Sequence, residues 1–122
     1  MATILVADDE PKLGKLVVEM LESAGHQVSH VSGGRAAIEK IASAPPDIVL
    51  TDLRMPEMDG FALAAELASQ GIGWPVLLMT SDNGPELARR AASQGIATVL
   101  RKPVDGAFLE EALGQAFARL EA

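Results

Sequence analysis

Five short apolar runs recur along the chain and are the strongest structural signal in the sequence. They are Thr3 to Ala7, Gln27 to Val31, Asp47 to Thr51, Pro75 to Met79 and Ala97 to Arg101. Most are rich in Val, Ile and Leu without polar alternation, which is typical of strands buried on both faces of a sheet. The second run is more polar, and we expect it to form an outer strand.

Helical periodicity fills the intervals between these runs. Apolar residues recur at i, i+3, i+4, i+7 and i+8 in two segments. These residues are Leu13, Leu16, Val17, Met20 and Leu21, and then Leu109, Ala112, Leu113, Ala116, Phe117 and Leu120. Three weaker helices are predicted over Arg35 to Ser43, Gly60 to Ser69 and Pro85 to Gln94. Gly25 suits a helix C-terminus, and Pro85 suits the first turn of its helix.

Strand and helix therefore alternate five times. This alternation predicts an α/β fold in which helices cover both faces of a five-stranded parallel sheet. The 122 residues contain no long linker and no low-complexity segment. We therefore expect a single domain over residues 1–122.

Composition narrows the classes of function. The 48 % hydrophobic content is enough for a substantial core. The absence of cysteine excludes disulfides, thiolate metal sites and cysteine nucleophiles, and it fits a cytoplasmic protein. A formal charge of -7 without a run of Lys or Arg argues against direct binding of nucleic acid. The apolar stretches are too short for a membrane span, and the N-terminus resembles a strand more than a signal peptide.

Polar residues follow four of the five predicted strands. Asp8 and Asp9 come after the first strand, Asp52 comes at the end of the third, Thr80 follows the fourth and Lys102 follows the fifth. In a sheet of this class, ligands bind beyond the carboxyl ends of the strands. We therefore expect these side chains to share one pole of the domain.

These residue types point to phosphoryl chemistry. Three crowded carboxylates repel one another and need a cation or a proton. Oxygen donors without His or Cys favour a hard ion such as Mg²⁺. A lysine ammonium and a threonine hydroxyl add donors for a group more negative than a carboxylate. Phosphoryl transfer depends mainly on positioning and charge neutralisation, and a carboxylate can itself be the nucleophile.

The same residues resemble a known family signature. The matching segments are Asp8-Asp9-Glu10-Pro11, Thr51-Asp52-Leu53-Arg54-Met55-Pro56-Glu57-Met58-Asp59-Gly60, Thr80 and Lys102-Pro103. In this order they resemble the receiver domain of bacterial two-component response regulators, of the chemotaxis-receiver type. The resemblance covers essentially the whole chain. It implies a flavodoxin-like, doubly wound (βα)5 fold with strand order 2-1-3-4-5.

The resemblance also implies roles at the metal and at the acceptor. Asp52 would accept a phosphoryl group from a sensor histidine kinase. Mg²⁺ would be bound directly by Asp9, Asp52 and the backbone carbonyl of Arg54, and by Asp8 through a water molecule.

Two further residues would contact the phosphoryl group. By the resemblance, Lys102 would pair with one phosphoryl oxygen. Thr80 would hydrogen-bond another and turn inward on phosphorylation. Pro103 would follow a cis peptide bond, as in the family.

The implied function is a phosphorylation switch and not an enzyme that turns over a separate substrate. Its output would be a changed protein-binding surface on the fourth helix, fifth strand and fifth helix. The partner there would be an effector domain, an output protein or a second copy of the chain. No membrane partner is expected.

Three positions depart from the family pattern. Val99 stands where the family usually has Tyr or Phe, Val104 where Phe is frequent, and Ser81 where Ala or Gly is frequent. None of these changes removes a chemical group from the site. Val99 lacks the ring that the usual aromatic switch of the family moves.

Simpler interpretations exist for each residue taken alone. Asp8 and Asp9 suit a solvated loop or a helix cap, and Thr80 with Ser81 suits a cap of the fourth helix. A lone Lys102 is ordinarily a surface charge. We expect Asp59 to cap the third helix, and His26 and His30 to be surface residues and not ligands.

Three other functions compete with the switch. An aspartyl phosphatase would typically carry Asp-x-Asp after the first strand, and this chain has Asp8-Asp9-Glu10. A nucleotide-binding module would need a glycine-rich phosphate loop, and neither usual pattern is present. The intact acidic cluster argues against a degenerate receiver, which binds partners without phosphorylation, but Val99 keeps that alternative open.

Overall fold

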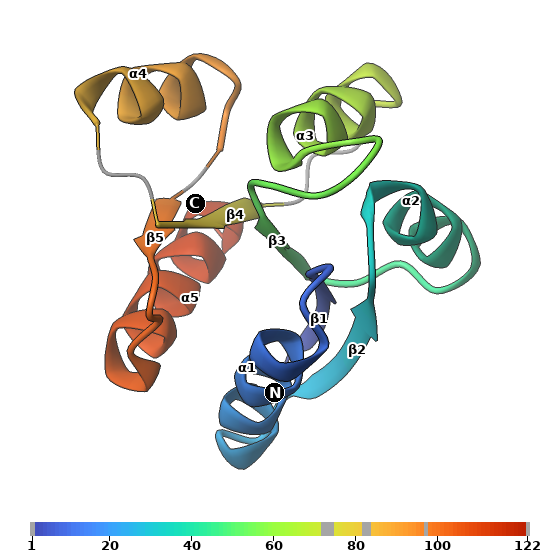
Figure 1. Ribbon diagram of the computed structural model, residues 1–122. Helices are drawn as coiled ribbons and strands as arrows, with labels where there is room; N and C mark the ends of the chain where they lie inside the picture. The colour runs from blue at the N-terminus through green and yellow to red at the C-terminus, as the bar shows by residue number, and fades with distance from the viewer. Residues whose placement is uncertain (1, 72–74, 82–83, 97, 122) are drawn as a thin grey trace.

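Strands and helices alternate along the chain as the periodicity predicts (Figure 1). The structure is a computed structural model that describes residues 2–71, 75–81, 84–96 and 98–121. The strands are β1 (Thr3–Ala7), β2 (Gln27–Val31), β3 (Ile48–Asp52), β4 (Val76–Thr80) and β5 (Thr98–Arg101). The helices are α1 (Pro11–Ser23), α2 (Gly34–Ser43), α3 (Gly60–Ser69), α4 (Pro85–Ser93) and α5 (Gly106–Glu121).

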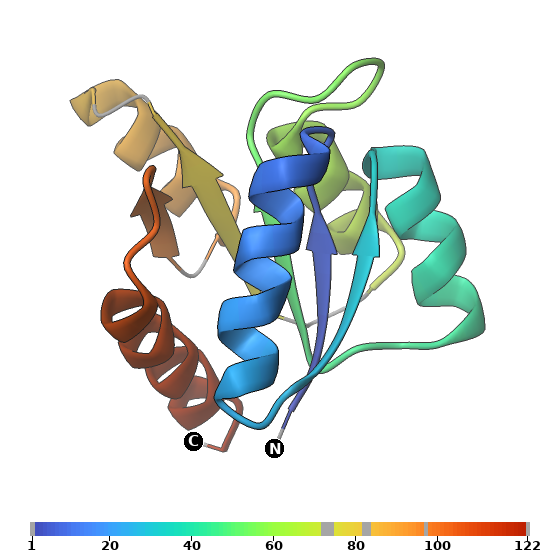
Figure 2. The same ribbon diagram turned by 60° about the horizontal axis from the view of Figure 1, so that its bottom comes forward.

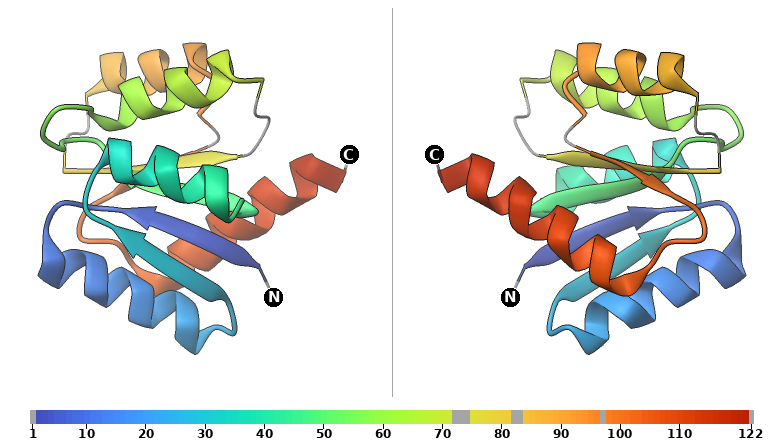
Figure 3. Two further views of the ribbon diagram at one scale, coloured as in Figure 1. Left: turned by 90° about the vertical axis from the view of Figure 1, so that its right-hand side faces the viewer. Right: turned by 90° about the vertical axis from the view of Figure 1, so that its left-hand side faces the viewer.

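The strands form one parallel sheet in the order β2-β1-β3-β4-β5, so the predicted topology is confirmed. The polar strand β2 lies at an edge of the sheet, as expected. Helices α2, α3 and α4 cover one face, and α1 and α5 cover the other (Figure 3). Because the strands point the same way, their carboxyl ends meet at one edge of the sheet (Figure 2).

Each face of the sheet has its own hydrophobic core. Leu5, Val49 and Leu78 point toward α2, α3 and α4, where they meet Ile41, Phe61 and Leu63 among others. Ile4, Leu50 and Met79 point the other way and meet Val17, Leu21 and Leu113. Every residue of β3 and β4 is buried. Burial on both faces explains why these strands are apolar without alternation.

The element boundaries agree with the prediction to within a residue or so. β3 and β4 each begin and end one residue later than expected, so that Asp52 and Thr80 are their last residues. Ala97, the predicted first residue of β5, lies outside the described residues. Gly25 follows α1 with a φ of 95°, which suits its predicted role at the helix end. Among the described residues, no helix combines the length and apolar character that crossing a bilayer requires.

Candidate functional site

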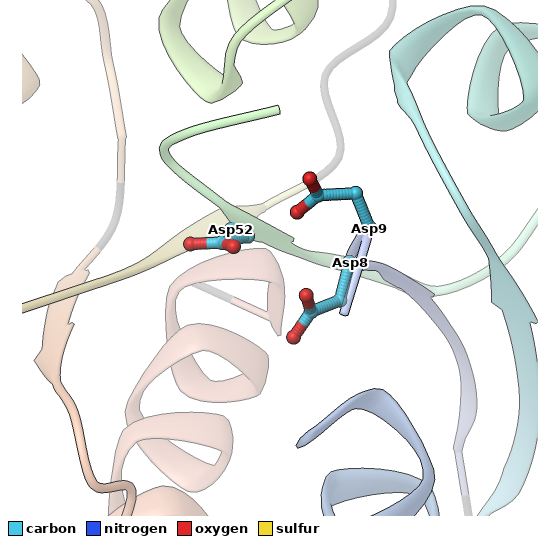
Figure 4. Close-up of side chains that lie close together, drawn as sticks. All are labelled: Asp8, Asp9 and Asp52. Carbon is cyan, nitrogen blue, oxygen red and sulfur yellow. The ribbon is translucent and has the colours of Figure 1, made fainter. Parts of the chain in front are cut away.

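The carboxyl edge of the sheet brings the three predicted carboxylates together. One carboxylate oxygen from each of Asp8, Asp9 and Asp52 lies within 4.8 Å of the other two (Figure 4). Asp8 is 1 % exposed and Asp52 is 5 % exposed, while Asp9 is more open to solvent. Two of the three carboxylates are therefore largely shielded from water. Because water screens charges, the repulsion between them is stronger in this buried position.

Asp8 is a buried carboxylate whose surroundings disfavour its charged form. Its Oδ1 accepts a hydrogen bond from the backbone N–H of Glu10 at 2.9 Å. Its Oδ2 is buried and has no hydrogen-bond partner among the described residues. Burial is the main cause that raises the pKa of Asp8. The hydrogen bond from the Glu10 N–H and the charge of Lys102 oppose this rise, while the carboxylates of Asp52 and Asp9 add to it. A buried carboxylate oxygen without a partner is costly, so this position favours a cation or a proton.

Lys102 supplies a positive charge directly beside the Asp52 carboxylate. Its Nζ lies 3.0 Å from Oδ1 of Asp52, and the two side chains are 18 % and 8 % exposed. The backbone N–H of Lys102 donates to the carbonyl of Thr80 at 2.9 Å, so the ends of β4 and β5 are joined next to the ion pair. Thr80 itself is 2 % exposed. The hydroxyl and the ammonium therefore come from adjacent strands.

The segment after β3 fixes the backbone of Asp52. A Cβ atom at Gly60 would lie 2.7 Å from the carbonyl oxygen of Asp52, so a larger residue would push α3 away from the strand. The N–H of Gly60 donates to the carbonyl of Leu53 at 2.8 Å. Asp59 caps α3 as predicted, since its Oδ1 accepts from the N–H of Ala62 at 2.8 Å. The Asp-Gly end of the motif is thus a support for Asp52.

Comparison with known proteins shows the family of this chain. The family model "Response regulator receiver domain" matches residues 4–114. The chain belongs to this family. It is therefore a receiver domain of two-component signalling.

Three relatives show the range of proteins that resemble this receiver domain. It is 36 % identical over 115 residues to the transcriptional regulatory protein GlrR of Escherichia coli, which covers 94 % of this chain and 26 % of that protein. It is 34 % identical to the sensor histidine kinase RcsC of Salmonella typhimurium, over 90 % of this chain and 12 % of that protein. The structure of the Vibrio cholerae chemotaxis protein CheY4 superimposes with a TM-score of 0.89 at 29 % identity, covering 95 % and 98 % of the two chains. The receiver thus spans about a quarter of the length of GlrR.

The structure places the residues predicted for this receiver domain as follows. Asp8, Asp9, Asp52 and Lys102 come together at one point. Arg54 is exposed two residues beyond Asp52 and lines a cleft that also includes Asp9. The Lys102–Pro103 peptide bond is cis, as the resemblance implied. Their roles in metal and phosphoryl binding stay predictions.

The departure at Val99 has a clear structural setting. Val99 is partly buried and packs against the core on the face covered by α2, α3 and α4. It pairs with Leu78 in the sheet register. A small side chain thus fills the position where the family usually has a ring.

The prediction that both histidines are surface residues is confirmed for His30, which is exposed, whereas His26 is partly buried. The His26 side chain is 12 % exposed, and its Nε2 lies 3.2 Å from Oε1 of Glu110 on α5. The N–H of Ala2 donates to its Nδ1 at 3.2 Å. His30 contacts the backbone of Asp8, a link that sequence reasoning missed because it joins β2 to the loop after β1.

The donor set of the site suits a hard cation. Its ligand candidates are carboxylate oxygens, and Oδ2 of Asp8 is a buried acceptor without a partner among the described residues. Mg²⁺ prefers oxygen ligands and is commonly held by one or two carboxylates. The three aspartates therefore fit the ion that the resemblance implies.

Proposed function

We propose that this receiver domain takes a phosphoryl group from the phosphohistidine of a sensor histidine kinase onto Asp52. One observation carries the proposal: three carboxylates converge on one point, and a lysine ammonium lies 3.0 Å from the acceptor carboxylate. That combination gives a nucleophile, a cation site and a positive charge for the transferred group. The whole chain, residues 1–122, would act as one switch and not as an enzyme with a separate substrate.

In the proposed reaction, a carboxylate oxygen of Asp52 attacks phosphorus. The new O–P bond gives an aspartyl phosphate as the N–P bond to the kinase histidine breaks. The released imidazole nitrogen takes up a proton. Lys102 then pairs with a phosphoryl oxygen, and the Thr80 hydroxyl donates a hydrogen bond to another. Because Lys102 already lies against Asp52, little reorganisation is needed before the phosphoryl group arrives.

The proposed cofactor is Mg²⁺. Asp9, Asp52 and the backbone carbonyl of Arg54 would bind it directly, and Asp8 would bind it through water. When bound, the ion neutralises charge on the phosphoryl oxygens. Asp8 and Asp9 would hold the ion beside the Asp52 carboxylate, which the convergence of the three side chains supports.

The proposed output is a changed protein-binding surface formed by α4, β5 and α5. An effector domain or an output protein would bind there, and a homodimer would use the same face if one forms. The similarity to GlrR, named a transcriptional regulatory protein, supports an effector domain as one such partner. We place the receiver in the cytoplasm, and the absence of cysteine fits that compartment.

Phosphorylation of Asp52 is tested by intact mass spectrometry after incubation with acetyl phosphate and Mg²⁺. The wild-type protein should gain the mass of one phosphoryl group, and a chelator should prevent the gain. Asp52→Asn should abolish it because the nucleophilic oxygen is lost. Asp47→Asn is a matched control, since Asp47 lies just before the other end of β3, where its Oδ2 accepts from the N–H of Thr3. Equal labelling of Asp52→Asn and wild type would refute the assignment.

A further inference from the structure

His30 contacts the loop that carries Asp8 and Asp9, and the proposed function gives this contact no role. Its Nε2 lies 3.0 Å from the backbone carbonyl oxygen of Asp8, so the ring N–H donates to that carbonyl. Side chains alternate along β2. Val28 packs into the core on the α1 and α5 face, and His30, two residues on, points the same way. The ring therefore lies between β2 and the start of α1.

Gly14 of α1 provides the space for this ring. A Cβ atom built at Gly14 would lie 2.4 Å from Nε2 and 2.7 Å from Cε1 of His30. Gly14 is buried within the helix, where glycine costs about 1 kcal/mol relative to alanine. The structure thus has a poor helix former at the one place where the histidine ring passes the helix backbone.

The hydrogen bond acts on the peptide that joins two candidate metal ligands. The carbonyl of Asp8 belongs to the peptide group between Asp8 and Asp9. On the other side of Asp8, its N–H donates to the carbonyl of Val31 at 3.0 Å. The end of β2 therefore holds both peptide groups that flank Asp8. A rotation of the second peptide plane would swing the Asp9 carboxylate relative to that of Asp8.

We propose that His30, seated over Gly14, is a positioning residue that sets the orientation of Asp8 and Asp9 for cation binding. The inference rests on the proposed function, because it assigns His30 to the same Mg²⁺ site. His30 does not touch the ion. It acts through the backbone carbonyl, and partners of metal ligands of this kind are worth roughly tenfold or more in metal affinity.

Four variants separate this role from a merely structural one. His30→Ala removes the donor, while His30→Gln keeps an N–H at the end of a side chain of similar reach. Gly14→Ala places a methyl group where the ring lies and so displaces it. In the double variant Gly14→Ala/His30→Ala there is no ring to displace. Gly114→Ala is the matched control, because it is the same substitution inside helix α5. A Cβ atom at Gly114 would have no neighbour within 4 Å among the described residues.

The measurement is a calorimetric titration with Mg²⁺ alone, together with the rate of labelling by acetyl phosphate at saturating Mg²⁺. His30→Ala and Gly14→Ala should each raise the Mg²⁺ concentration for half-saturation roughly tenfold. The double variant should match His30→Ala, and His30→Gln and Gly114→Ala should match wild type. At saturating Mg²⁺ all variants should be labelled at the wild-type rate, since the acceptor and Lys102 are unchanged.

Two outcomes would overturn the inference while leaving the proposed function intact. If wild type binds Mg²⁺ and is labelled but His30→Ala has the same half-saturation, His30 does not position the ligands. If Gly14→Ala weakens binding equally with and without His30, the glycine acts through the helix and not through the ring. Failure of wild type itself to bind Mg²⁺ or become labelled would instead overturn the proposed function, and this inference with it. Thermal unfolding by circular dichroism confirms that each variant is folded.

Discussion

Helices α3 and α4 follow the two central strands of the site, yet they are built very differently. α3 buries five of its residues, Gly60, Phe61, Leu63, Ala64 and Leu67, and a side chain caps its start. In α4, all of whose residues are described, Ala91 alone is buried. Gly84 occupies the N-cap position of α4 and provides no side-chain hydrogen bond to the helix. The helix after Asp52 is therefore anchored, and the helix after Thr80 is only lightly attached.

A cleft of about 540 Å³ separates the two helices, lined by Met55 and Phe61 on one side and by Leu87 and Arg90 on the other. The guanidinium carbon of Arg90 lies 4.2 Å from the centre of the Phe61 ring, which links α4 to α3 across this cleft. Segments with few buried apolar contacts are those that open or move at low free energy. The comparison teaches that the Asp52 side of the site is firmly anchored by α3, whereas α4 is the helix that can move at a lower free energy.

The largest expected effect is on the free energy of unfolding when a leucine is replaced by alanine in each of the two helices. Leu63 of α3 is fully buried, and Leu63→Ala should lower the free energy of unfolding by about 2–5 kcal/mol. Leu87 of α4 is half-buried, and Leu87→Ala should cost about 1 kcal/mol, because much less apolar area returns to water. Urea denaturation of both variants measures the difference. A cost for Leu87→Ala equal to that for Leu63→Ala would remove the distinction between the helices.

A second, smaller effect concerns the electrostatic cost of burying the Asp8 carboxylate. Asp8→Asn should raise the midpoint of thermal unfolding at neutral pH when a chelator is present, because it removes a buried carboxylate whose pKa is raised chiefly by burial. Added Mg²⁺ should stabilise wild type more than the variant. Hydrogen exchange in α4 should be the same in both proteins. A destabilised Asp8→Asn variant would mean that the charge is compensated within the fold.

The pH dependence of this effect follows from the direction of the pKa shift. The folded protein holds the Asp8 proton more tightly than the unfolded chain, whose ordinary value is 3.8. Stability from this group is therefore present at low pH and is lost as pH rises from 3.8 through the raised folded pKa. The advantage of Asp8→Asn over wild type should grow over that interval and then level off. A constant advantage down to acidic pH would contradict the assignment to Asp8.

Much of this architecture could be predicted because the physical signals are local. Short runs of apolar residues, the second more polar than the others, identified all five strands, and residues that follow strands identified the carboxylates and Lys102. The ends of β3 and β4 were missed by one residue, since the last ladder hydrogen bonds, such as that from Leu53 N–H to Met79 at 2.9 Å, leave no trace in hydrophobicity. Asp52 and Thr80 are polar, and a pattern of apolar residues stops just before them.

The contact of His30 could not be predicted in this way. It joins two segments that are 22 residues apart, and it depends on the absence of a side chain at Gly14. A glycine inside an otherwise helical pattern was the available signal, and such a glycine often has a packing reason. Identifying the partner required the pairing of His30 with Val6 in the sheet, which places the ring beside α1. Local sequence carries the residue types, and the register of the sheet decides which of them meet.

The smallest expected effect tests whether the missing cap keeps α4 loosely attached. Gly84 has φ -71° and ψ 148°, which any residue can adopt, and a Cβ there meets nothing within 4 Å among the described residues. In Gly84→Ser, the hydroxyl oxygen can accept from the backbone N–H of Glu86 or Leu87. Serine is favoured over glycine at this position by a few tenths of a kcal/mol, so amides of α4 should exchange roughly half as fast while those of α3 are unchanged.

Beryllofluoride, as a phosphoryl mimic, should alter exchange in α4 more than in α3, and Gly84→Ser should reduce that response. Hydrogen exchange followed by mass spectrometry gives both readings. Equal protection of α3 and α4 in the wild-type protein, or a response to beryllofluoride confined to residues 8–10 and 52–55, would show that α4 is not the element through which the site acts.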